Sequence, residues 1–424
     1  MKFETLALHA GNKIDSDTLS RANPLYRTAS YLFKNAEHAA NLFSLKESGY
    51  IYTRLNNPTN DVLEQRLATL EGGKAGLAIS SGTSAIFYTI INIMENGDEF
   101  ISANNLYGGT WTMFNDILPQ FGIKCKFVDP KNPDNFKKAL TDRTKAIFVE
   151  TIGNPVLDVV DFEEISKIAK EAEIPLIVDS TFTTPYLFKP IEYGANIVIH
   201  SLTKWIGGHG TVIGGIVIDA GNFNWKNPKF RLYTEPEKSY HDLRFAYDLG
   251  ELNDIAFILR MRLIPLRNLG ACLSPDNAWQ ILQGIETLAL RMERHSENAK
   301  KVAEYLGKHP KVEWVRYPGL KNDPSYSIAS KYFKKGFGGM VVFGIKGGMS
   351  AGKKFIENLK LFSLLANVGD AKSLVIHPAT TTHSQLTEKQ QIEAGLQPEL
   401  IRLSIGIENI DDILEDLENG FKNL

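Results

Sequence analysis

The chain has 424 residues, and its 47 Lys and Arg against 49 Asp and Glu leave a net charge of -2. This balance excludes a broad basic surface for DNA or RNA, and a hydrophobic content of 43% with 10% aromatic residues excludes a disordered chain. The two cysteines, Cys125 and Cys272, provide neither a disulfide framework nor four zinc ligands. The composition predicts a large globular protein of roughly two to four folding units.

The N-terminal sequence MKFETLALHAGNK carries charges and lacks the apolar core of a signal peptide. Residues 75–94 are uncharged over a length that could span a membrane. The small polar sequence SSGTS interrupts this stretch, so we interpret it as a buried strand, a turn and a helix. These features predict a soluble, cytoplasmic protein that has no membrane partner.

Residues 1–60 are irregular, rich in Gly, Asn, Pro and Tyr, and contain one predicted helix over 36–47. Because such a segment rarely folds alone, we expect it to lie against another surface. We define it as the N-terminal arm. From Asp61 onward the sequence pattern changes, and the apolar residues of 61–71 recur with helical spacing.

Short apolar runs then alternate with amphipathic stretches up to residue 218. The run AIFVE and the run IPLIVD are apolar nearly throughout, as strands covered on both faces are. Strand–helix alternation predicts an α/β domain with a mostly parallel sheet, whose functional groups lie at the carboxyl ends of the strands. The predicted strands are 76–80, 98–103, 123–128, 145–150, 174–180, 196–201 and 213–218. The predicted helices are 83–95, 108–120, 133–140 and 161–172.

Residues 219–265 break this alternation with a mixture of aromatic and charged residues. The segment is either a surface insertion or a cover near a pocket, and we assign it, as an inserted cover, to a large domain over 61–265. Residues 266–424 form a predicted smaller C-terminal α+β domain. Its helical pattern covers 276–308, 350–359 and 410–421, and its predicted strands cover 339–345 and 401–405.

The most specific motif is His200-Ser-Leu-Thr-Lys-Trp-Ile-Gly-Gly-His-Gly, which follows a predicted buried strand. A lysine at such a place is costly unless it has a partner or a covalent role. The Lys204 amine can form a Schiff base with a carbonyl, as pyridoxal 5′-phosphate (PLP) requires. Ser201 and Thr203 alternate with Leu202, so their hydroxyls could face one ligand. By itself, Ser-x-Thr-Lys could also place a lysine that simply caps a strand end.

Two further motifs fit the same cofactor. Asp179 ends the strand IPLIVD, and a carboxylate beside the pyridine nitrogen keeps the PLP ring protonated. Alone, this residue could equally cap a turn. The sequence Ser80-Ser-Gly-Thr-Ser84 joins a strand to a helix, and a helix N-terminus of this kind binds phosphate. Neither a Walker loop nor a Gly-x-Gly-x-x-Gly fingerprint is present, which disfavours a dinucleotide enzyme.

Together these motifs resemble the Cys/Met-metabolism PLP-dependent enzymes of fold type I, over nearly the whole chain. The resemblance implies PLP on Lys204, Asp179 at the pyridinium nitrogen, and phosphate contacts from Gly82, Thr83, Ser201 and Thr203. It also implies a stacking and proton-transfer role for Tyr107, an Asn154 position near the ring's 3′-oxygen, and a grip of Arg402 on the substrate α-carboxylate. Tyr52 and Arg54 would reach the phosphate of a neighbouring subunit, in a homotetramer built from dimers with shared sites. No metal is implied.

Within this family, two features distinguish the branches. Methionine γ-lyases carry Cys where Gly109 stands, whereas Ser239-Tyr-His241 and the runs 365–370 and 381–384 look like O-acetylhomoserine sulfhydrylase. The implied reaction is a transferase γ-replacement in methionine biosynthesis, in which O-acetyl-L-homoserine and sulfide give L-homocysteine and acetate. Alternatives are a methionine or cystathionine γ-lyase, a cystathionine or O-succinylhomoserine-type synthase, and a non-catalytic or carrier-dependent protein on the same scaffold.

Overall fold

The predicted apolar runs between residues 75 and 219 form a seven-stranded sheet in the computed structural model, which describes residues 1–381, 396–422 and 424. The strand order is β1-β7-β6-β5-β4-β2-β3, and all pairs are parallel except those that β7 makes with β1 and β6. The mostly parallel sheet is therefore confirmed. Its strands are β1 (Ala75–Ile79), β2 (Glu99–Ala103), β3 (Lys124–Val128), β4 (Thr144–Glu150), β5 (Leu176–Asp179), β6 (Ile197–Ser201) and β7 (Gly215–Asp219).

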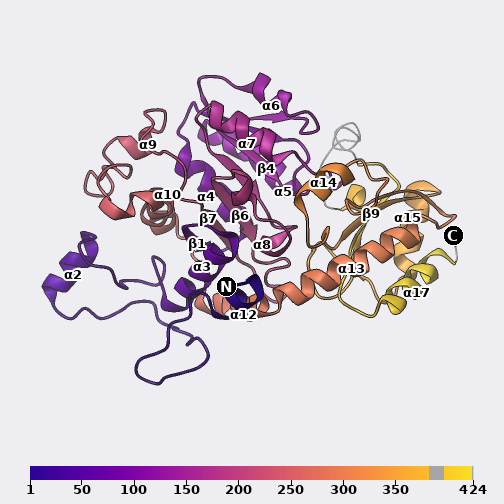
Figure 1. Ribbon diagram of the computed structural model, residues 1–424, viewed down its shortest axis with the longest axis horizontal. Coiled ribbons are helices and arrows are strands. Elements are labelled where there is room, and N and C mark those ends of the chain that lie inside the picture. The colour runs from indigo at the N-terminus through magenta and orange to yellow at the C-terminus, as the bar shows by residue number, and fades with distance from the viewer. Residues whose placement is uncertain (382–395, 423) are drawn as a thin grey trace.

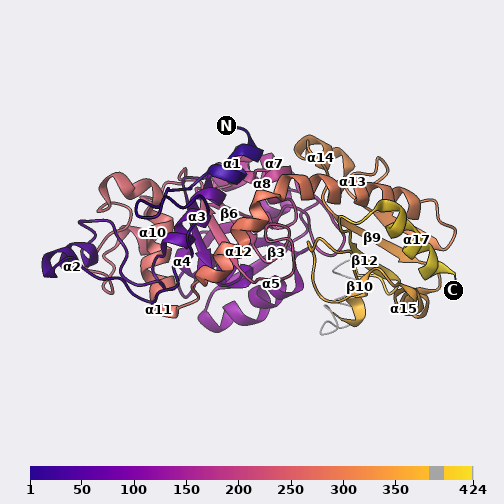
Figure 2. The same cartoon turned by 90° about the horizontal axis from the view of Figure 1, so that it is seen from below.

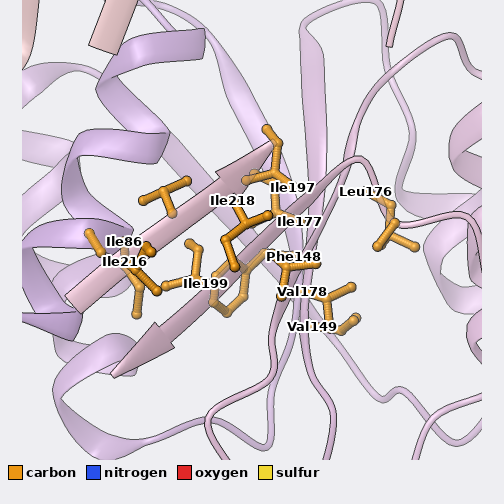
Figure 3. Close-up of a cluster of buried hydrophobic side chains, with 14 of the residues drawn as sticks. Ile86, Phe148, Val149, Leu176, Ile177, Val178, Ile197, Ile199, Ile216 and Ile218 are labelled. Carbon is orange, nitrogen blue, oxygen red and sulfur yellow. The ribbon is translucent and has the colours of Figure 1, made fainter. Parts of the chain in front are cut away.

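Helices cover both faces of this sheet (Figure 1). The interior strands are consequently apolar on both sides, and Ile147, Phe148 and Val149 have no exposed surface. Figure 3 shows Phe148 and Val149 together with isoleucines of β5, β6 and β7. The helices of this part are α3 (Pro58–Glu71), α4 (Gly82–Ile93), α5 (Gly108–Thr112), α6 (Asp134–Ala139), α7 (Phe162–Glu171), α8 (Thr184–Leu187) and α12 (Pro275–Glu286), with a π turn at Met113–Ile117 and 3₁₀ turns at Leu118–Phe121 and Pro190–Tyr193.

The N-terminal arm contains two helices, α1 (Phe3–His9) and α2 (Ala36–Phe43). The prediction of one helix in this segment is therefore wrong, because Phe3 and Ala7, one turn apart, bury a face that anchors α1 on the core. Phe3 packs edge-on against Tyr186. Beyond α1 the arm and α2 extend away from the body of the molecule (Figure 1).

Residues 219–265 place most of their aromatic side chains in the large hydrophobic core, where α10 packs against β7. Trp225 stacks on Tyr233 and Phe257, and all three rings are buried. The segment is thus integrated into the large hydrophobic core. Its helices are α9 (Arg231–Thr234) and α10 (Ala256–Met261), with a 3₁₀ helix at Gly250–Ile255, and a π turn (Arg262–Leu266) and α11 (Arg267–Leu269) follow.

The C-terminal part is built on a five-stranded sheet of order β10-β11-β12-β9-β8. The predicted strands correspond to β9 (Met340–Ile345) and β12 (Leu400–Ser404), whereas β8 (Val312–Arg316), β10 (Ser363–Leu364) and β11 (Leu374–Ile376) were not predicted. β10 and β11 are two and three residues long and β8 is partly exposed, so none produces a long apolar run. The helices are α13 (Leu288–Leu306), α14 (Tyr326–Tyr332), α15 (Gly348–Asn358) and α17 (Ile410–Phe421), with a 3₁₀ turn at Pro378–Thr380.

The long helix α13 connects the two sheets (Figure 2). Its first half, including Leu288 and Met292, belongs to the large hydrophobic core, and its second half, from Ala299 to Leu306, belongs to the smaller one. No helix among the described residues is long and apolar enough to cross a membrane.

Candidate active site

The carboxyl ends of four neighbouring strands meet at one cavity of ≈ 260 Å³. Tyr107 follows β2, Glu150 ends β4, Asp179 ends β5, and Lys204 follows β6. Because parallel strands present their carboxyl ends at the same edge, residues far apart in sequence come together there. The predicted site residues that line the cavity are Gly82, Thr83, Tyr107, Asn154, Asp179, Ser201, Thr203, Lys204 and Arg402.

The Lys204 amine is largely buried in this cavity. Its Nζ donates a hydrogen bond to Oδ1 of Asn367 at 2.6 Å. Burial, and secondarily the charge of Arg402, lowers the pKa of Lys204 to about 8. The neutral fraction near neutral pH is therefore larger than for an ordinary lysine, and the neutral amine is the form that attacks a carbonyl or accepts a proton.

Asp179 provides a buried carboxyl group at the end of β5. Its Oδ1 accepts the backbone N–H of Thr181 at 2.9 Å, and within the described part of the chain no lysine, arginine or histidine forms an ion pair with it. Burial raises the pKa of Asp179, and the hydrogen bonds from Thr181 oppose that shift. A cationic ligand group at this position would supply the missing counter-charge.

The N-terminus of α4 lies directly against the end of β6. Ser81 caps the helix by accepting the N–H of Ser84 at 3.0 Å, and Ser81, Gly82 and Thr83 at this helix N-terminus line the cavity. A Cβ atom on Gly82 would lie 2.7 Å from Cβ of Ser201, so glycine is required for this close approach. The hydroxyl of Thr203 accepts the N–H of Gly214 at 3.1 Å. The arrangement is a site for a small anion such as a phosphate group.

Arg402 enters the cavity from β12 of the C-terminal sheet. The side chain is 6% exposed, and its guanidinium donates to Oδ1 of Asn154 at 3.2 Å. No carboxylate among the described residues pairs with it, and burial lowers the pKa of Arg402 to about 10. A buried guanidinium without a carboxylate favours a ligand that brings one.

Tyr52 and Arg54 do not line this cavity. They belong to the N-terminal arm, where the Arg54 guanidinium lies 4.9 Å from the Tyr52 ring centre and donates to the carbonyl of Arg267 at 3.0 Å. The Tyr52 side chain is 40% exposed. Within one chain these residues are separate from the other predicted site residues.

The structure adds site residues that the sequence analysis did not assign, notably Glu150 and Asn367. Glu150 ends an apolar strand, as Asp179 does, so the same signal could have identified it. Asn367 lies in the run 365–370, but its contact with Lys204 depends on how the two sheets pack. No residue of 219–265 lines the cavity among the residues that the structure describes, so this segment covers nothing there in a single chain. Of the run 381–384, residues 382–384 lie outside the described residues.

The donor set of this cavity fits PLP. The reactive amine matches the aldehyde of the cofactor, the buried carboxyl without a cation matches its ring nitrogen, and the anion site matches its phosphate. The buried guanidinium matches the carboxylate of an amino-acid substrate. Groups of three or more His, Cys, Asp and Glu that could hold a metal ion are absent from the part of the chain that the structure describes.

An α/β fold with such a cavity at its sheet edge defines the class of lysine-dependent PLP enzymes of fold type I. The sequence matches the description "Cys/Met metabolism PLP-dependent enzyme" over residues 4–422, and the chain belongs to this family. It is therefore a PLP-dependent protein, as the resemblance implied.

Similar proteins cover the whole chain. An O-acetyl-L-homoserine sulfhydrylase from Leptospira meyeri is 57% identical, over 100% of this chain and 97% of the relative. O-acetyl-L-homoserine sulfhydrylase 1 from Thermus thermophilus is 50% identical, over 99% of this chain and 100% of the relative. A crystal structure of a putative O-acetylhomoserine (thiol)-lyase from Campylobacter jejuni is 42% identical, with a TM-score of 0.96 and complete coverage of both chains. That structure contains a pyridoxyl-lysine phosphate at its position 205.

Proposed function

We propose that this protein is a PLP-dependent transferase that converts O-acetyl-L-homoserine and sulfide to L-homocysteine and acetate. Full-length identity of 57% to a sulfhydrylase of this specificity is the observation that carries the substrate assignment. The cavity that contains Lys204, Asp179 and Arg402 supports the reaction class. Such a reaction serves methionine biosynthesis.

In this proposal the chain holds both the cofactor and the substrate. Bound PLP supplies an electron sink for charge that develops at the substrate Cα. Asp179 would hold the ring nitrogen protonated, Tyr107 would stack on the ring, and Asn154 would lie near the 3′-oxygen. Gly82, Thr83, Ser201 and Thr203 bind the phosphate.

Lys204 performs the proton transfers. In its neutral form the Lys204 amine would remove the proton from Cα of the substrate and then help to move a proton at Cβ. Acetate leaves from Cγ, sulfide adds there, and the protons return. Arg402 binds the α-carboxylate through two parallel hydrogen bonds and orients Cα toward Lys204.

We further propose a cytoplasmic homotetramer built from dimers with shared active sites. In each dimer, Tyr52 and Arg54 would contact the phosphate in the neighbouring subunit's cavity. Tyr52 is 40% exposed, Arg54 is partly buried, and neither lines the cavity of its own chain, which supports a role at a neighbouring subunit. We retain the predicted division into an arm (1–60), a large domain (61–265) and a C-terminal domain (266–424), with the difference that α12 and the first half of α13 pack in the large hydrophobic core.

An assay of acyl donors with and without sulfide tests the reaction. We expect acetate and homocysteine to form in near-equal amounts from O-acetyl-L-homoserine and sulfide, and free methionine to be cleaved poorly. Faster degradation of methionine than formation of homocysteine would favour a γ-lyase instead. Borohydride reduction followed by peptide mapping should place the pyridoxyl group on Lys204.

A further inference from the structure

Glu150 lies in the sheet between the strand that ends at Asp179 and the strand that leads to Tyr107. It is paired with Asp179 in the parallel register of β4 and β5. Residues paired in this way direct their side chains to the same face of the sheet, and both carboxyl groups line the cavity. Two acidic side chains therefore face the place proposed for one pyridinium nitrogen.

Glu150 also contacts the backbone of the proposed stacking residue. The backbone N–H of Tyr107 donates to Oε1 of Glu150 at 2.7 Å. Tyr107 precedes the short helix α5, has no side-chain cap, and is half exposed. The hydrogen bond thus connects the segment that carries the Tyr107 ring to the rigid end of β4.

The surroundings of Glu150 favour its uncharged form. The side chain is 7% exposed, and no cation among the described residues forms an ion pair with it. The other charged or titratable side chains that line the cavity are Asp179 from β5, Lys204 after β6, Arg402 from β12 and the Tyr107 hydroxyl. Burial, and secondarily the charge of Asp179, raises the pKa of Glu150 well above its usual value.

We propose that Glu150 is a positioning residue that acts as a neutral carboxylic acid, holding the backbone of Tyr107 and leaving Asp179 as the carboxylate for the ring nitrogen. This inference rests on the proposed function. A neutral acid keeps a carbonyl oxygen that accepts the Tyr107 N–H without adding a second negative charge beside Asp179.

The test compares Glu150→Gln, Glu150→Ala and Glu150→Asp with wild-type protein. PLP affinity is measured by adding PLP to the apo-proteins, and kcat/KM for acetate release is measured between about pH 6 and 8. Glu150→Gln keeps an oxygen acceptor and cannot ionise, so both quantities should stay within about threefold of wild type and the pH profiles should superimpose. Glu150→Ala and the shorter Glu150→Asp lose the contact, and PLP affinity should fall by about tenfold.

Glu99→Gln is the matched control, because Glu99 lies at the opposite end of the same sheet and pairs with Lys126. A loss of more than about tenfold in Glu150→Gln, with a wild-type melting temperature, would show that the carboxylate acts ionised and would overturn the proposal. Wild-type PLP affinity in Glu150→Ala, or in Glu150→Asp should the alanine variant not fold, would overturn it as well. Absence of PLP binding by the wild-type protein would overturn the proposed function as well as the role of Glu150. A failure confined to the Glu150 variants would overturn only the role of Glu150, so the two failures are distinguishable.

Discussion

Lys204 and Arg402 share one buried cavity, and the charge of Arg402 makes Lys204 easier to deprotonate. The pKa of Lys204 is lowered to about 8 by burial and by Arg402. A group whose folded-state pKa is lowered becomes neutral at a lower pH than in the unfolded chain. Between about pH 8 and the ordinary lysine value near 10.4, Lys204 is therefore mostly neutral only when the protein is folded.

This lowered pKa predicts how the apo-protein reacts with an amine-modifying reagent. The modification rate of Lys204, followed by peptide mapping, should rise with pH and reach half its maximum at about pH 8. An N-acetyl-lysine amide measured alongside should reach its half-maximum near pH 10.4, about two pH units above the midpoint of Lys204. Coincident midpoints would mean that the cavity does not desolvate the amine.

Arg402 predicts a second result at the residue scale. Arg402→Ala should weaken substrate binding by about 2–4 kcal/mol, because the α-carboxylate loses a charge-assisted pair in a buried site. The loss should be seen mainly as a higher KM. Arg402→Lys keeps the charge but not the planar fork, so it should recover part of the loss. Unchanged amino-acid binding in Arg402→Ala would require another partner for the carboxylate.

At the scale of elements, the site depends on helix α4 beginning against the end of strand β6. The Gly82 and Ser201 backbones approach so closely that a methyl group does not fit between them. Gly215 on β7 is similarly constrained, since a Cβ there would lie 2.2 Å from the carbonyl oxygen of Ser81. These contacts fix the helix N-terminus at the proposed phosphate position.

Gly82→Ala should therefore displace α4 and weaken PLP binding by about 1–3 kcal/mol, the usual cost of overpacking a rigid contact. PLP affinity measured on the apo-protein, together with the melting temperature, separates a local effect from unfolding. Gly352→Ala in α15 is the matched control, because a Cβ there meets its neighbours at 3.4 Å or more. Equal PLP affinity in both variants would argue against a phosphate site at this helix end.

At the scale of the whole molecule, the proposed site residues divide into two groups. Those from 82 to 204, together with Arg402, surround one cavity in a single chain, whereas Tyr52 and Arg54 lie on the N-terminal arm away from it. If two subunits exchange their arms, a complete site takes Lys204 from one chain and Arg54 from the other.

A complementation experiment tests this arrangement. Mixing inactive Arg54→Ala and Lys204→Ala subunits in equal amounts should restore roughly a quarter of the wild-type activity, because half of the dimers are hybrids with one intact site. Lys204→Ala mixed with Arg402→Ala is the control, since both residues belong to one chain's cavity and no hybrid site is intact. No recovery in the first mixture, with subunit exchange demonstrated, would contradict a shared site.

Much of the α/β architecture and of the candidate site could be predicted from local sequence. The apolar runs that end in Asp179 or precede Lys204 are typical of strands buried on both faces of a sheet. A buried lysine or carboxyl group at the end of such a strand indicates a functional role. Helix α1 and the short strands β8, β10 and β11 were missed, because their few apolar residues are stabilised by tertiary packing and form no long periodic pattern.

The sequence by itself determined the order of the strands along the chain and the residue types at their ends. Only the tertiary structure decided which ends are neighbours: it placed Glu150 between Asp179 and Tyr107, and it brought Asn367 to Lys204. The physical reason is that spatial neighbours across a parallel sheet, or across two packed domains, are set by long-range burial of apolar surface. Short-range spacing along the chain carries no information about that packing.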